Sequence, residues 1–172
     1  MTGRATGADP VTAVGDIAVA HTPPGGYGST MPLPVLARCS EPIVAGAPDL
    51  RGTWRVVAFA SDDPAFDGAR LRDHVERLEQ AGDRLVVTGG GVVHDMRADG
   101  TVEHGVDDVM AVDFTTPIRV AATFEEGVLV LRPVGMPGVE VRRWRHGDQL
   151  VWQYGQLFTA RLERVDPRAE QR

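Results

Sequence analysis

The sequence contains neither lysine nor asparagine, so arginine carries all 18 of its formal positive charges. The lack of lysine excludes a Schiff base, a Walker-type phosphate loop and a Ser–Lys dyad, because each of these needs a lysine amine. The 24 acidic residues leave a formal net charge of −6, and the arginines are scattered along the chain. Nucleic-acid binding needs clustered positive charge that displaces counterions from phosphate, so we expect no nucleic-acid partner. The all-arginine usage is typical of a GC-rich, bacterial genome.

Cysteine and long apolar runs are almost as scarce. The single cysteine, Cys39, excludes an intramolecular disulfide, and no histidine lies near it in the sequence to activate it as a nucleophile. A Gly-x-Ser-x-Gly elbow is also missing. The sequence shows no secretory signal and no apolar run of about 18 residues, the length that a membrane span needs. We therefore expect a soluble cytoplasmic protein without a membrane partner.

The first 48 residues differ in composition from the rest of the chain. They hold seven of the twelve prolines and many glycines, and they show no sustained periodicity. This composition predicts an N-terminal arm over residues 1–48 that is extended and partly disordered. A free tail is favoured for residues 1–28, whereas residues 31–36 (MPLPVL) are apolar enough to dock on the domain. We expect that domain to span residues 49–166, followed by a tail over residues 167–172.

From Leu50 onward, short β-like runs alternate with turn dipeptides at a spacing of roughly 8–12 residues. Pairs such as Asp99-Gly100 indicate tight hairpins, because their turns need positive φ. The pattern predicts an all-β fold, an antiparallel meander β-barrel of about 8–10 strands, since closure removes the exposed edges of a meander. The strands are expected over residues 52–59, 84–88, 92–98, 101–104, 108–114, 118–124, 128–133, 139–145, 150–154 and 157–165.

One segment, residues 70–80, is ambiguous. Leu71, Val75 and Leu78 have helical spacing. However, "RLEQAGDRLVV" also looks like two strands around a tight turn, and we favour a strand over residues 73–80 that pairs with residues 84–88. The alternative is a helix over residues 70–80, and a short helix near residues 64–71 also stays open.

Three features of this domain occur together in a known superfamily. Gly52-x-Trp54 opens the first predicted strand, a meander follows, and Arg161 lies in the last strand. Residues 139–165 contain a charged strand, an Asp/Gly turn, an apolar strand, a glycine turn and a final strand with a central arginine. This combination resembles the calycin superfamily of lipocalins and fatty-acid-binding proteins, and it is most similar to the fatty-acid-binding branch. The resemblance spans about residues 49–165.

The resemblance implies roles for Trp54 and Arg161. In the family, the tryptophan packs across the closed end of the barrel, and the arginine of the last strand lies against it. In the fatty-acid-binding branch, an Arg-x-Tyr pair of that strand holds a ligand carboxylate. Here Arg161 is followed by Leu162-Glu163, so the tyrosine is missing. Two roles therefore stay open for Arg161: an anion anchor in the cavity, or the buried cation–π partner of Trp54, which we favour.

Strand alternation groups the other candidate residues. His94 and Met96 share one face of their strand, and Trp152 and Tyr154 share one face of theirs. A histidine titrates near neutrality, which suits acid–base chemistry or ligand contact. Aromatic side chains on one face either fill a core or line an apolar cavity. Arg143, in a neighbouring strand, could make the cavity basic if it points inward.

We expect the barrel to bind a small hydrophobic or amphipathic molecule, with an anionic ligand included. The expected ligand-binding residues are Arg161, His94, Met96, Trp152, Tyr154 and Arg143. One alternative is a barrel enzyme with His94 as its acid/base. Another is a non-catalytic self-association module, such as a homodimer, that uses the arm. The histidines lack the spacing of a known metal motif, so no metal and no cofactor is expected.

Overall fold

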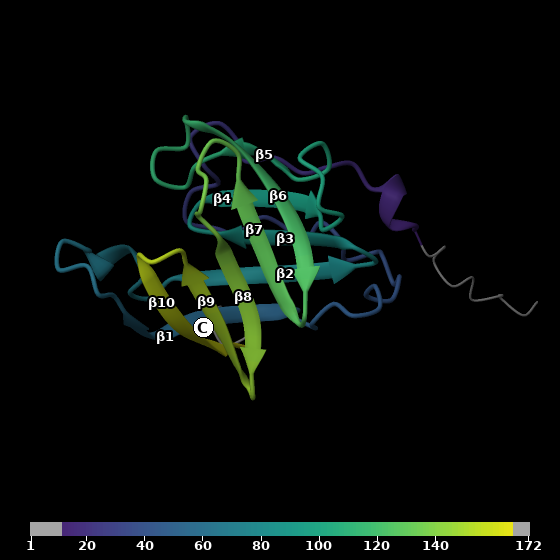
Figure 1. The fold of residues 1–172 in the computed structure, drawn as a ribbon. Coiled ribbons are helices and arrows are strands. Elements are labelled where there is room, and N and C mark those ends of the chain that lie inside the picture. The colour runs from purple at the N-terminus through teal and green to yellow at the C-terminus, as the bar shows by residue number, and fades with distance from the viewer. Residues whose placement is uncertain (1–11, 167–172) are drawn as a thin grey trace, which may run out of the picture.

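The computed structural model describes residues 12–166, which contain one antiparallel sheet rolled into a nearly closed barrel (Figure 1). Each strand pairs with the next one along the chain, except β4 and β5, which do not pair and form the two edges of the sheet. The first and last strands, β1 and β10, pair with each other. In Figure 1, β6 and β7 pass in front of β2 and β3 at a steep angle. The strands are β1 Gly52–Ala60, β2 Val75–Ala81, β3 Arg84–Gly89, β4 Val92–Arg97, β5 Val106–Val109, β6 Pro117–Glu125, β7 Val128–Pro133, β8 Val141–His146, β9 Gln149–Tyr154 and β10 Phe158–Arg164.

This architecture confirms the all-β meander barrel expected from the sequence. The ambiguous segment is a strand from Val75 onward, because β2 pairs with β3 in the antiparallel register Gln80↔Leu85. The turn between them places Gly82 at φ 55°, a conformation that glycine adopts without strain. Within residues 64–71, where a short helix had stayed open, the chain forms the 3-10 helix η2 at Gly68–Arg70.

Residues 101–104 were predicted as a strand and instead form a turn, so that prediction was wrong. The carboxylate of Asp99 accepts hydrogen bonds from the backbone N–H of Thr101 at 2.9 Å and from Nδ1 of His104 at 2.5 Å. An aspartate that binds the groups following it in this way favours a closed turn over an extended chain.

The next strand, β5, is shorter than the predicted residues 108–114 and ends at Val109. The backbone N–H of Met110 donates to the carbonyl of Thr116 at 2.9 Å, which closes a loop. Within this loop Phe114 has a φ of 57°, in the left-handed region, and therefore cannot continue a strand.

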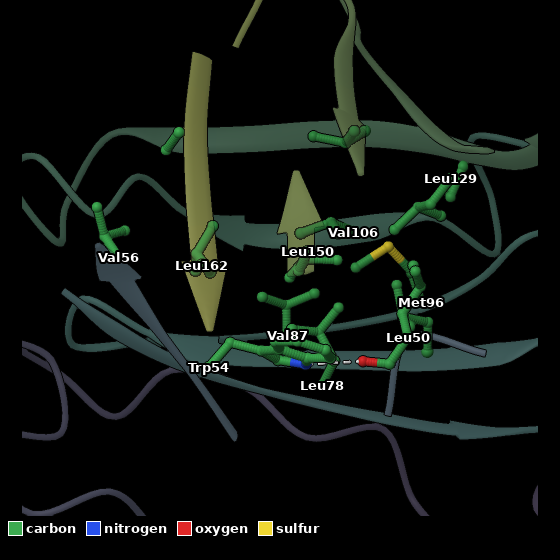
Figure 2. Packing of buried hydrophobic residues seen from close by; sticks show 14 of the residues in the cluster. Leu50, Trp54, Val56, Leu78, Val87, Met96, Val106, Leu129, Leu150 and Leu162 are labelled. Carbon is green, nitrogen blue, oxygen red and sulfur yellow. Dashed lines mark hydrogen bonds between the residues drawn. The ribbon is translucent and has the colours of Figure 1, made fainter. Parts of the chain in front are cut away.

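The end of the barrel around Trp54 is packed solid. Trp54 is fully buried, and its indole Nε1 donates to the carbonyl of Leu50 at 3.0 Å (Figure 2). Leu78, Leu150 and Leu162 are also almost inaccessible to solvent, and Figure 2 shows them in the same cluster. This filled end holds a large part of the hydrophobic core, and its burial is the main stabilising contribution to such a fold.

The arginine of the last strand that contacts Trp54 is Arg164, whose guanidinium carbon lies 4.7 Å from the ring centroid. Arg161, which was expected there, is exposed, because Ala160 and Leu162 on either side of it are fully buried on the inner face. Arg164 has the same phase in the strand as Leu162 and therefore reaches the tryptophan. The interpretation of Arg161 as the buried partner was wrong.

Residues 12–48 lie across the outer face of the sheet. Val14 and Leu36 from this arm pack against Val86 and Val93 of β3 and β4 in a second, smaller hydrophobic cluster. All residues of β3 are consequently buried. The expectation of a free tail is wrong for residues 12–28, and residues 1–11 lie outside the described part.

Charged side chains of the strands bind the backbone of this arm. Arg84 and Asp95 form a buried pair with N···O distances of 2.8 and 2.6 Å. The Arg84 guanidinium also donates to the carbonyls of Val14, Ile17 and Ala18 at 2.7–2.9 Å. These contacts satisfy backbone groups that the irregular arm cannot pair within itself.

Across residues 12–166, none of the helical segments has the length and hydropathy to span a lipid bilayer.

Candidate functional site

The barrel half away from Trp54 encloses a cavity of about 670 Å³. Its wall is mostly apolar and includes side chains from nearly every strand, among them Val87, Ile118 and Leu131. Several lining residues are exposed and therefore mark the mouth of the cavity: Arg70, Val112, Met136 and Leu157.

Near the mouth, the arm approaches the cavity. The backbone N–H of Tyr27 donates to the carbonyl of Gly91 at 2.9 Å, in the β3–β4 turn. Phe114, a lining residue, packs so closely on Gly26 and Gly91 that a Cβ at either glycine would lie within about 3.0 Å of its ring. At the mouth, the β3–β4 turn and the β5–β6 loop, which contains Phe114, are therefore in contact with each other and with the arm.

A buried ion pair lies in the cavity wall. Glu76 of β2 is 1% exposed and Arg143 of β8 is 5% exposed. The Arg143 guanidinium donates to both carboxylate oxygens of Glu76, from Nε at 2.9 Å and from Nη2 at 3.1 Å. Nε2 of His74 lies 3.3 Å from the same carboxylate. This arrangement is a fork-shaped, charge-assisted contact with a third donor added.

The environment of Glu76 keeps its carboxylate ionised. Burial alone would raise its pKa. The charge of Arg143 and the hydrogen bonds from His74 and Arg143 outweigh this effect and lower the pKa of Glu76 to about 2. At neutral pH the negative charge of Glu76 therefore offsets the positive charge of Arg143.

Aromatic rings complete this part of the wall. The guanidinium carbon of Arg143 lies 4.8 Å from the centroid of the Trp152 ring, and the His74 ring lies 5.2 Å from it. Trp152 meets Phe158 edge-on at 4.9 Å, and Tyr154 stacks on Phe158 at 5.7 Å. Arg143 is thus fixed between a carboxylate and an indole face.

His94 lies in the same cavity, on edge strand β4, and its Nε2 is 2.9 Å from the carbonyl oxygen of Val109 on the other edge strand. A carbonyl can only accept, so Nε2 carries the proton and, in the neutral ring, Nδ1 keeps its lone pair. Burial lowers the pKa of His94, and the nearby charge of Arg143 lowers it further, against the opposing effects of Val109 and Asp108. The neutral ring is therefore the favoured form.

Of the ligand-binding residues predicted from the sequence, His94, Arg143, Trp152 and Tyr154 line the cavity together. Met96 points inward as expected, but it is 2% exposed and belongs to the packed core rather than to the cavity wall. Arg161 lies on the outer face of β10 and does not reach the cavity, so its placement as an internal anion anchor was wrong. Contact of the four lining residues with a ligand stays a prediction.

The sequence interpretation did not identify His74 and Glu76. In β2 the residues alternate as Val75, Glu76, Arg77 and Leu78, so each face holds one apolar and one charged residue. The phase of the strand was therefore undetermined. Leu78, which is fully buried, carries the signal that would have placed Glu76 on the inner face beside it.

Among the residues that the structure describes, no group of three or more histidine, cysteine, aspartate or glutamate side chains is arranged to hold a metal ion.

Comparison with solved structures identifies the fold. Human cRBP IV, a cellular retinol-binding protein, superposes with a TM-score of 0.53 at 17% identity, covering 68% of this chain and 98% of its own. A zebrafish ileal bile acid-binding protein, solved with cholic acid, gives a TM-score of 0.51 at 18% identity, covering 67% of this chain and 98% of its own. No protein-family model and no curated sequence matches the chain. The chain therefore shares the antiparallel barrel fold of these two proteins, and about a third of its length has no counterpart in either of them.

Proposed function

We propose that this protein binds a small, largely apolar molecule inside the barrel. The observation that carries the proposal is the cavity of about 670 Å³ inside the barrel. In smaller barrels, side chains fill this space and leave no room for a ligand. Its size falls within the range of roughly 300–1,000 Å³ that is usual for small-molecule sites. An apolar wall with a few converging polar groups is also the usual composition of such a site.

The two solved structures compared above support the proposal. One is a retinol-binding protein, and the other was determined with cholic acid. Retinol and cholic acid are both mainly hydrocarbon with polar groups attached. The burial of that hydrocarbon would supply most of the binding free energy here, at about 0.8 kcal/mol for each methylene removed from water.

The proposal can be tested by filling the cavity. Ile118 on β6 lines the cavity, and its neighbour Arg119 is exposed on the outer face of the same strand. Ile118→Trp should weaken binding of the neutral fluorophore Nile red by about tenfold or more, because the indole takes up ligand volume. Arg119→Trp adds the same side chain outside and should leave the affinity unchanged.

Fluorescence titration measures both variants, and circular dichroism establishes that each is folded. Native mass spectrometry of the purified wild-type protein should in addition detect a bound apolar molecule. Equal affinity of the wild type and Ile118→Trp, or no binding by the wild type, would falsify the proposal.

A further inference from the structure

Within the proposed binding cavity, we infer that the site selects an uncharged, hydroxyl-bearing amphiphile over a carboxylate, because Glu76 cancels the charge of Arg143 while leaving some of its donors open. This inference rests on the proposed function and specifies the chemical class of its ligand. It assigns Arg143 and His94 as the hydrogen-bonding partners of the ligand, and Glu76 as the residue that determines its charge.

The first argument is the balance of charge. Two arginines line the cavity: Arg70 lies exposed at the mouth, and Arg143 lies buried in the inner wall. Both Nε and Nη2 of Arg143 are already bound to Glu76. A ligand carboxylate beside Arg143 would also lie close to the carboxylate of Glu76, whose repulsion opposes the attraction from Arg143. The free-energy cost of removing the charged carboxylate from water would therefore not be offset by a net attraction in the site. An uncharged polar group avoids both penalties.

The second argument is the set of groups that still lack a partner. Within residues 12–166, Nη1 of Arg143 makes no hydrogen bond, and it is not among the buried side-chain nitrogens that are fully shielded from solvent. Because Arg143 lines the cavity, these N–H donors are accessible from inside it.

His94 provides the complementary group. Its Nε2 is used by Val109, and in the neutral ring Nδ1 is an acceptor that likewise makes no hydrogen bond with the described residues and is not fully shielded. A hydroxyl can accept from a guanidinium and donate to an imidazole, whereas an ionised carboxylate can only accept. A ligand hydroxyl can therefore pair with either open group, whereas the carboxylate of a fatty acid can pair only with the Arg143 donor.

The wild-type protein tests the inference with ligands of one chain length. Dodecan-1-ol and dodecanoate compete with bound Nile red, and their displacement curves are compared. We expect the alcohol to displace the fluorophore at about tenfold lower concentration. If dodecanoate competes equally well or better, the inference is overturned, while the proposed function stands because a ligand has bound. If neither compound displaces the fluorophore, and Nile red itself does not bind, both proposals fall.

Substitution of Glu76 tests its role directly. In Glu76→Gln the charge of Arg143 is no longer offset, so the ratio of dodecanoate to dodecanol affinity should rise by about tenfold or more. Glu163→Gln, on the exposed outer face of β10, loses the same charge and should keep the wild-type ratio. An unchanged ratio in a folded Glu76→Gln protein contradicts the inference.

A second variant keeps the test decisive if Glu76→Gln does not fold. The double substitution Glu76→Gln/Arg143→Gln removes both charges and leaves no unpaired ion in the wall. It should retain the preference for the alcohol, because the two charges already cancel in the wild type and the glutamine amide at position 143 still offers N–H donors to a hydroxyl. A large loss of dodecanoate binding in the double variant, with dodecanol unaffected, would show that Arg143 holds the carboxylate and would overturn the inference.

Discussion

At the scale of single residues, the molecule keeps its charge inside the barrel as a balanced pair. Glu76 and Arg143 are both at least 95% buried and bind each other through two hydrogen bonds. Buried pairs of this kind contribute little net stability, since desolvation offsets much of their attraction, but loss of one partner is costly. The pair is therefore better explained by the chemistry of the cavity than by the stability of the fold.

This view predicts a strongly non-additive mutant cycle. Glu76→Leu alone should lower the free energy of unfolding by about 3–5 kcal/mol, because Arg143 is left buried without a counter-charge. The double variant Glu76→Leu/Arg143→Met should recover most of that loss, since apolar side chains of similar volume replace both ions. Urea unfolding of Glu76→Leu, Arg143→Met, the double variant and the wild type measures the coupling energy between the two residues. Additive losses would contradict the prediction.

The same cycle has a pH dependence with a defined sign. The pKa of Glu76 in the folded protein is lowered to about 2 from an ordinary value of 4.5. The stability that its ionisation contributes is therefore fully present above about pH 4.5 and is lost as the pH falls from there towards about 2. The wild type should lose more free energy of unfolding than the double variant between about pH 6 and about pH 3.

The candidate site shows how far single residues can be predicted. Alternation correctly grouped Trp152 with Tyr154, because the large apolar side chains on one face of the strand show which face points into the barrel. It misplaced Arg161, because the predicted strand over residues 157–165 put the apolar Leu157 on the same face as Arg161. Strand β10 begins only at Phe158, so Leu157 lies outside it. The contact between Glu76 and Arg143 joins residues 67 positions apart in the chain, so no local pattern could have shown it.

At the scale of elements, strands β2 to β4 differ from the rest of the barrel because the arm covers their outer face. Most strand boundaries followed from the turn residues, and the segment predicted as a strand over residues 73–80 is one from Val75 onward. The docking of the arm was not predicted, since its proline-rich backbone has no periodicity. The contacts that hold it come from distant strand side chains such as Arg84 and Asp95.

Arg84 is therefore expected to hold the arm on the barrel. Arg84→Gln should leave Asp95 buried without its counter-charge and remove three hydrogen bonds to arm carbonyls, lowering the free energy of unfolding by about 3–5 kcal/mol. Amide hydrogen exchange should accelerate in the arm, while β6 and β7 stay protected.

A matched control lies on β4. Arg97 pairs with Asp83 at 2.8 Å, but its side chain is 42% exposed. Arg97→Gln should cost less than about 1 kcal/mol, the usual range of an exposed pair, and leave exchange in the arm unchanged. Equal effects of the two substitutions would show that the buried pair is not what fixes the arm.

At the scale of the whole molecule, the barrel divides into a filled end and an open end. The filled end, with Trp54, Leu150 and Leu162, supplies close-packed apolar contacts, and these residues do not line the cavity. The open end lacks close-packed apolar contacts across its cavity of about 670 Å³. Stability and binding should therefore respond to different substitutions.

Leu150→Ala tests this division. Truncation in the filled end should lower the free energy of unfolding by about 2–5 kcal/mol through lost burial and the cavity it creates. The affinity for a ligand should not change, because Leu150 does not line the cavity. A ligand present at about 100 times its Kd should consequently stabilise Leu150→Ala by the same 2.7 kcal/mol or so as the wild type.

Ile118→Trp is the opposite case, because its substitution lies in the open end. The indole should fill space that is empty in the free protein, so the free energy of unfolding should change less than in Leu150→Ala, while the stabilisation by ligand should largely disappear. Thermal unfolding of both variants with and without ligand separates the two effects. If Leu150→Ala lost the ligand-dependent stabilisation, the two ends would be coupled, and the filled end would have to be counted as part of the binding site.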